Sequence, residues 1–162
     1  MATDNKEVPP NFGRSGKEPS TAELHYLLGT QLAELKHYER AATEITQALE
    51  LQPDLHTARL QLGLLYLTLG QPARAVASWA PLEALAADAW PRLFKQGLEA
   101  LIRDDLARCV LLLEAGIQAN TENAPLNRDM QRLLAKAREA GTKRRSESGT
   151  EAIRSDFSLY NQ

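Results

Sequence analysis

The chain has 162 residues, of which 43% are hydrophobic and 25% charged, a composition typical of one soluble globular domain with a core of moderate size. Its formal net charge of −2 gives no electrostatic footprint for nucleic acid or for an anionic membrane, and the basic cluster of Lys143, Arg144 and Arg145 is too small to change that. Its single cysteine cannot form an intramolecular disulfide, and no apolar stretch approaches the roughly 20 residues that span a bilayer.

Residues 1–20 hold prolines and glycines among polar residues and lack the apolar core of a secretory signal. Such a segment cannot bury enough apolar surface to order itself, so we expect a flexible lead-in at 1–20. Together with the single cysteine, this favours a cytoplasmic protein without membrane insertion.

From residue 21 to about 140 the pattern is helical almost throughout, rich in leucine and alanine and poor in β-branched residues. Residue series recur at a step of 34 residues within it: Gly29, Gly63 and Gly97; Ala41, Ala75 and Cys109; Ile45, Trp79 and Leu113. Small residues at a fixed register suit two antiparallel helices where their axes cross. A period of 34 predicts helix–turn–helix hairpins that stack side by side.

These residues resemble the tetratricopeptide repeat (TPR). The second unit carries the string Leu62-Gly63-x-x-Tyr66, then Gly70 and Ala75-x-x-x-Trp79. The first unit shows Leu28-Gly29, Tyr38, Ala41 and Ile45, and closes with the string Ala48-Leu49-Glu50-Leu51-Gln52-Pro53-Asp54. The third unit departs from the pattern, because Gln96 and Ala100 replace the usual leucine and aromatic and no proline closes it.

The resemblance implies an all-α fold: a right-handed superhelix of three TPR hairpins, with units at about 22–55, 56–89 and 90–123. Pro53 follows a helix and stops it. Pro81 lies inside the second helix of the second unit, so we expect that helix to kink or end there and the link 81–89 to be irregular.

The last hairpin needs a covering helix, because stacked hairpins leave an apolar face on the final unit. The segment 125–140 supplies one, with an apolar stripe at helical spacing formed by Leu126, Met130, Leu133, Leu134 and Ala137. Pro125 suits a first helical turn, and Gly141 suits a helix end. We therefore expect seven helices in a TPR domain at 21–140, followed by a flexible C-terminal tail at 141–162.

The residue types that carry catalysis or bind metals form no convincing constellation. His25, His37 and His56 are scattered over two units, whereas zinc needs three or four ligands that converge. Cys109 takes a helix-crossing position and should be buried and inert, and Asp104-Asp105 falls in a turn, where capping is the expected role. We expect no enzyme, no cofactor and no metal.

TPR proteins bind peptides or helices in a groove lined by the first helices of successive units. The resemblance carries this groove onto eight residues: Tyr26, Thr30, Leu60, Leu64, Leu67, Phe94, Leu98 and Leu101. Because the helix from Leu60 to Leu69 is nearly apolar all round, something should cover it. Two explanations compete. In one, the superhelix is tight or the capping helix or a tail folds over the groove. In the other, an apolar partner segment binds there, and Leu64→Asp or Phe94→Asp would abolish this binding while leaving helicity largely intact.

TPR domains that grip the C-terminal aspartate of chaperones use a clamp of lysines, asparagines and an arginine. The corresponding residues here are Tyr26, Thr30, Gln61, Pro91 and Lys95. Only Lys95 could contribute charge, so a carboxylate clamp is disfavoured.

These features favour a protein–protein interaction scaffold or adaptor that binds an apolar peptide or amphipathic helix. The alternatives are a dedicated chaperone of a single client, like the small three-repeat chaperones of bacterial specialised secretion, or an accessory subunit of an enzyme. Self-association and a contact of the tail 156–162, which carries Phe157, Leu159 and Tyr160, with the groove also stay open. The alanine- and leucine-rich composition suits a bacterium.

Overall fold

In the computed structural model, which describes residues 18–159 and the side chains of residues 18–149, the chain forms α-helices, one short 3₁₀ helix and, over that range, no strand. The elements are α1 (Thr21–Glu34), α2 (Tyr38–Leu51), α3 (His56–Thr68), α4 (Pro72–Trp79), η1 (Ala80–Ala84), α5 (Trp90–Ile102), α6 (Leu106–Ala119) and α7 (Ala124–Leu159). The predicted all-α class and the seven helices are thus confirmed for this part of the chain. The expectations for residues 1–17 and for the side chains of the tail motif lie outside it.

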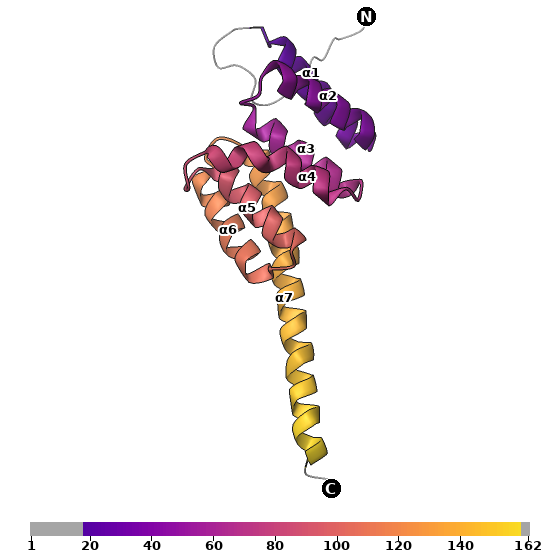
Figure 1. The fold of residues 1–162 in the computed structure, drawn as a ribbon, viewed down its shortest axis with the longest axis vertical. Coiled ribbons are helices and arrows are strands. Elements are labelled where there is room, and N and C mark those ends of the chain that lie inside the picture. The colour runs from indigo at the N-terminus through magenta and orange to yellow at the C-terminus, as the bar shows by residue number, and fades with distance from the viewer. Residues whose placement is uncertain (1–17, 160–162) are drawn as a thin grey trace, which may run out of the picture.

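The helices pair in chain order into three hairpins, α1 with α2, α3 with α4 and α5 with α6. Figure 1 shows these hairpins stacked one after another, with α7 following α6. Contacts between α2 and α3 and between α3 and α5 join the hairpins, and α7 packs on α6. The handedness of a superhelix stays a prediction.

The repeated glycines lie where the two helices of each hairpin come closest. A Cβ added at Gly29, Gly63 or Gly97 would come closer than 3.0 Å to the residue 16 positions later, which is Ile45, Trp79 and Leu113 respectively. Ala41, Ala75 and Cys109 have no exposed surface. The residue series that repeat in the sequence therefore meet one another in space.

The turn inside each hairpin is also repeated. One residue in each has a positive φ: Lys36 at 62°, Gly70 at 70° and Asp104 at 64°. In each turn this residue donates its N–H to a carbonyl three residues back, and the next residue donates to a carbonyl five residues back, at 2.8–3.0 Å. This bonding satisfies the last carbonyls of the first helix.

The second hairpin is irregular at its proline, as predicted. Helix α4 ends at Trp79, and the chain passes through η1, which contains Pro81, before α5 begins at Trp90. Pro81 lacks the N–H that would continue the α-helical bonding.

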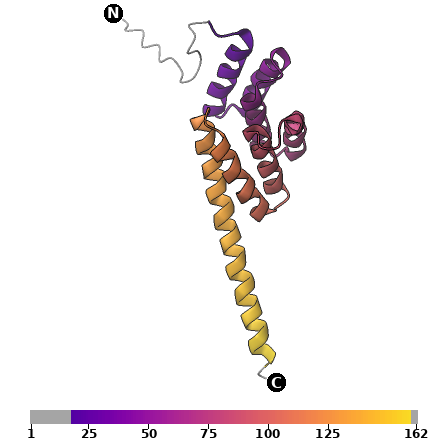
Figure 2. The same ribbon diagram turned by 90° about the vertical axis from the view of Figure 1, so that its left-hand side faces the viewer.

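The capping helix is longer than predicted. Its apolar stripe is buried as expected at Leu126, Met130, Leu134 and Ala137. However, α7 continues through Gly141 to Leu159 and extends past the hairpins (Figures 1 and 2).

The predicted helix end at Gly141 is therefore corrected. Gly141 does not have the positive φ of a terminating glycine, and side chains of α7 bind the third hairpin on both sides of it. Arg138 pairs with Glu114, and Arg144 donates two hydrogen bonds to Asp104, at 2.6 and 2.9 Å. A glycine inside a helix costs only about 1 kcal/mol, so such contacts can offset it.

Candidate functional site

The eight residues predicted to line a groove divide into two groups. Leu60, Phe94 and Leu98 have no exposed surface and belong to the core, which corrects their placement on an open surface. Phe94 also packs on α6, because a Cβ added at Gly116 would come closer than 3.0 Å to its ring. The remaining residues are partly exposed: Tyr26, Thr30, Leu64, Leu67 and Leu101.

The open surface beside the first helices consists of two adjoining hollows, of about 520 and 310 Å³, which share Thr30, Glu34 and Gln61. The larger lies between α1, the start of α3 and the turn before α7, and includes Tyr26 and Trp90. The smaller reaches along α1 and α3 to Leu64 and to Asp129 of α7. We call these two hollows together the α1–α3–α7 cleft.

Three of the predicted residues therefore line the cleft: Tyr26, Thr30 and Leu64. Leu67 and Leu101 line neither hollow. Sequence reasoning missed the contribution of Glu34, and it named Gln61 only as a clamp position and the capping helix only as a cover for the groove. A signal for α7 was present, since a helix that covers the last hairpin must begin beside its first helix.

Polar groups inside the cleft lack partners. The side-chain atoms Gln61 Oε1 and His56 Nδ1 are buried and make no hydrogen bond with the described part of the chain. Both residues line the larger hollow, and Gln61 lines the smaller one as well. An unmet buried hydrogen-bonding group costs about 1–3 kcal/mol. Both atoms are covered by the chain, so a ligand would bond them only after their side chains rotate into the cleft.

The charges around the cleft have one sign. Its lining includes four exposed carboxylate residues, Glu34, Asp54, Glu122 and Asp129, and neither a lysine nor an arginine. Asp129 is paired with Arg132 of its own helix at 3.2 Å. The cleft thus combines apolar walls with an acidic rim.

Burial at the cleft alters one titratable group. Tyr26 lies on α1, and desolvation raises the pKa of its hydroxyl to about 12. This side chain therefore stays neutral throughout the physiological range and presents an aromatic ring with a polar tip.

A group of asparagines positions the start of α7 against the cleft. Asn120 is buried, and its Oδ1 accepts the N–H groups of Glu122 and Asn123 at 3.2 and 3.1 Å. Its Nδ2 donates to Asn127 Oδ1 at 2.9 Å, and Asn127 Nδ2 donates back to the Asn120 carbonyl at 2.8 Å. These bonds replace the proline that closes the first unit.

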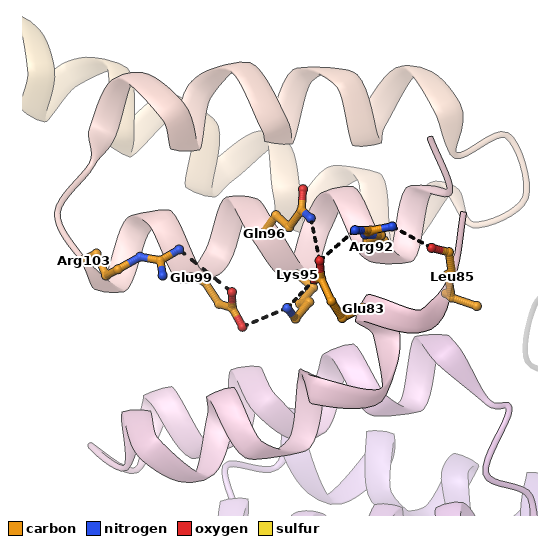
Figure 3. A network of polar contacts seen from close by, with 7 residues as sticks. All are labelled: Glu83, Leu85, Arg92, Lys95, Gln96, Glu99 and Arg103. Atoms are coloured by element: carbon orange, nitrogen blue, oxygen red, sulfur yellow. Dashed lines mark hydrogen bonds and ion pairs between the residues drawn. The ribbon is translucent and has the colours of Figure 1, made fainter. Parts of the chain in front are cut away.

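Lys95 is the one charged residue among the positions that correspond to a carboxylate clamp, and it binds carboxylates of the chain itself (Figure 3). Its Nζ lies 2.6 Å from Glu83 and 3.3 Å from Glu99, and its side chain is 8% exposed. Arg92 also donates to Glu83, at 2.8 Å, and bonds the Leu85 carbonyl at 2.9 Å. The network fixes the link after η1 onto α5. Because the Lys95 ammonium is largely buried and held between two carboxylates, it is not available as a clamp for a carboxylate ligand.

The positions considered for chemistry have structural roles. Cys109 is fully buried, and this burial together with the nearby Asp105 charge raises the pKa of its thiol. Asp105 caps α6 by accepting the Arg108 N–H at 3.1 Å, as predicted, and His25 binds Glu44 across the first hairpin at 2.7 Å. Among residues 18–149 no group of three or more His, Cys, Asp or Glu side chains could hold a metal ion.

No helix in the described range combines the length and the apolar character needed to cross a membrane.

Comparison with known proteins agrees with this architecture. Residues 22–55, which contain α1 and α2, match the family model of the tetratricopeptide repeat. No curated protein matches the chain. The match supports a tetratricopeptide repeat at residues 22–55, and α3 with α4 and α5 with α6 form two further helical hairpins after it.

Proposed function

We propose that this protein is a non-enzymatic scaffold that binds a short apolar peptide, or one face of an amphipathic helix, in the α1–α3–α7 cleft. A tetratricopeptide repeat is a protein–protein interaction module, and proteins of this family are in general non-catalytic. The proposal concerns where this chain binds and what kind of segment it takes.

The observation that carries the proposal is the pairing of an apolar wall with unmet hydrogen-bonding groups in one cleft. Tyr26, Leu64 and Ala33 line the cleft and are only partly buried. Gln61 and His56, which line the same cleft, each hold a buried side-chain atom without a hydrogen-bond partner in the described part of the chain. Extended peptides offer both apolar side chains and backbone N–H groups, so they suit this combination.

The extent of the open apolar surface favours an adaptor over a chaperone that shields a long client segment. Leu60, Phe94 and Leu98 are covered within the chain itself, so they offer no apolar surface to a client. What stays accessible is a cleft of two hollows, of about 520 and 310 Å³. A cleft of this size takes a few side chains rather than a whole helix.

The proposal is tested by selecting peptides from a random 12-residue library displayed on phage against the full chain. Peptides that bind the chain should lose at least tenfold in affinity against Leu64→Asp, because the carboxylate would be desolvated against the bound apolar side chain. Fluorescence anisotropy of labelled peptides measures this loss.

The matched control is Leu111→Asp, since Leu111 is 68% exposed on α6 and lines neither hollow. It should bind like the unaltered chain. Circular dichroism should show unchanged helicity for both variants. Equal binding by Leu64→Asp, or no enrichment of peptides at all, would contradict the proposal. Phe94→Asp is not a suitable test, because Phe94 is a core residue and a buried charge there would unfold the third hairpin.

A further inference from the structure

The acidic rim of the α1–α3–α7 cleft restricts which apolar segments can bind. Glu34 closes α1 and lines both hollows, and Asp54 lies in the turn just before α3 and lines the larger one. Both are exposed, and neither carboxylate makes a hydrogen bond or ion pair with another described residue. With no lysine or arginine in the lining, nothing within the cleft offsets their field.

The unmet acceptor lies inside this field. Gln61 Oε1 is buried within the part of the cleft that Glu34 also lines, and it needs a donor. A lysine or arginine side chain has several N–H donors and no acceptor, so it suits the carboxylates of the rim and, once the Gln61 amide rotates into the cleft, this oxygen as well. The aromatic rings of Tyr26 and Trp90 at the same hollow offer surface to the aliphatic part of such a side chain.

We propose that the cleft selects a basic amphipathic segment of a partner protein. Apolar side chains of that segment pack against Tyr26 in the larger hollow and against Leu64 in the smaller one, and its lysine or arginine side chains face Glu34 and Asp54 on the rim. This inference rests on the proposed function, and it adds the charge that the bound segment must carry.

The basic cluster of this chain is badly placed to be the ligand within the same molecule. Arg144 is bound to Asp104 in the turn before α6, whereas the cleft meets α7 at Pro125 and Asp129. Fifteen residues of α-helix, from Asp129 to Arg144, span roughly 22 Å at 1.5 Å per residue. A separate polypeptide with its own basic residues is therefore the occupant that the charges favour.

The test compares peptide selection on the unaltered chain with selection on Glu34→Lys/Asp54→Lys. Peptides enriched on the unaltered chain should hold an excess of lysine and arginine next to apolar residues. Their affinity for the double variant should fall at least tenfold. Raising the salt from 50 to 500 mM should weaken binding to the unaltered chain, because salt screens exposed charges.

The matched control is Glu39→Lys/Glu50→Lys, which makes the same change of net charge on exposed carboxylates of α2 that line a different hollow. It should retain the affinity of the unaltered chain to within about twofold. If both double variants lose affinity equally, the effect comes from net charge and the proposal of a specific acidic rim is overturned.

The remaining outcomes separate this inference from the function on which it rests. Enriched peptides without excess basic residues, whose binding still depends on Leu64, would overturn the inference and leave the proposed function standing. Peptides whose binding ignores Leu64 as well would overturn both. Selection that succeeds only after residues 1–17 are deleted would identify that segment as the occupant and contradict a partner protein.

Discussion

In each hairpin one residue between the two helices has a positive φ, and only the second hairpin places a glycine there. Side chains with a Cβ pay roughly 1–2 kcal/mol for this conformation. Lys36 and Asp104 adopt this conformation despite that energy, and the same two backbone hydrogen bonds form in all three turns. Asp104 gains the contact with Arg144 in return, whereas the exposed Lys36 makes no side-chain hydrogen bond or ion pair with described residues.

We therefore expect Lys36→Gly to raise the free energy of unfolding by about 0.5–1 kcal/mol, as relief of the backbone strain outweighs the greater entropy of glycine in the unfolded chain. Urea denaturation followed by circular dichroism measures the change. Gly70→Lys, the reciprocal substitution at the equivalent turn, should lower stability by at least 1 kcal/mol. A destabilised Lys36→Gly variant would contradict the assigned turn conformation.

At the scale of elements, polar contacts fix the positions of two segments that the apolar pattern of the sequence does not specify. The link from η1 to α5 is held by Glu83, which accepts hydrogen bonds from Lys95, Arg92 and Gln96 (Figure 3). These bonds, that of Lys95 foremost, lower the pKa of Glu83 to about 2. The start of α7 is similarly held by Asn120, Asn123 and Asn127.

Because the pKa of Glu83 is lower in the folded chain than in the unfolded chain, the free energy of unfolding depends on pH in the acid range. Its ionised form contributes stability that is fully present above the unfolded pKa of about 4.5 and is lost as the pH falls toward about 2. The loss should be about 1 kcal/mol, since the side chain is 47% exposed and solvent screens its charge. Thermal unfolding of Glu83→Gln should show a smaller drop between pH 6 and pH 3 than the unaltered chain.

Glu50→Gln is the control, because Glu50 is exposed and makes no ion pair with the described residues. It should keep the full acid dependence. Identical pH profiles for Glu83→Gln and the unaltered chain would show that the network does not stabilise the link.

At the scale of the whole molecule, much of the fold could be predicted because the residues that repeat in the sequence contact one another in the structure. Gly63 and Trp79 recur 34 residues after Gly29 and Ile45, and each pair is a contact between the two helices of one hairpin. The stripe of α7 could be read in the same way, since the core needs it at helical spacing. Pro81 marks the end of a helix by its own covalent chemistry.

The cleft was harder to predict because its boundaries depend on how hairpins and α7 sit against one another. Leu60 and Leu98 carry the groove register of the family, but neighbouring side chains cover them completely. The nearly continuous apolar character of the helix from Leu60 to Leu69 was the sequence signal for that burial. Asp129 and Pro125 of the capping helix also line the cleft. The residue pattern within one unit does not specify where that helix lies, so it could not predict their contribution.

Binding of a basic amphipathic peptide between α1, α3 and the start of α7 can be followed residue by residue. It is tested most directly by NMR amide shifts of the full chain, labelled with ¹⁵N and titrated with a selected peptide. We expect the largest shifts at Thr30, Glu34, Gln61 and Asp129, including the side-chain amide of Gln61, with little change at Glu50 and Arg74 on the α2–α4 side. The largest shifts at Glu50 and Arg74, with Gln61 unmoved, would contradict it.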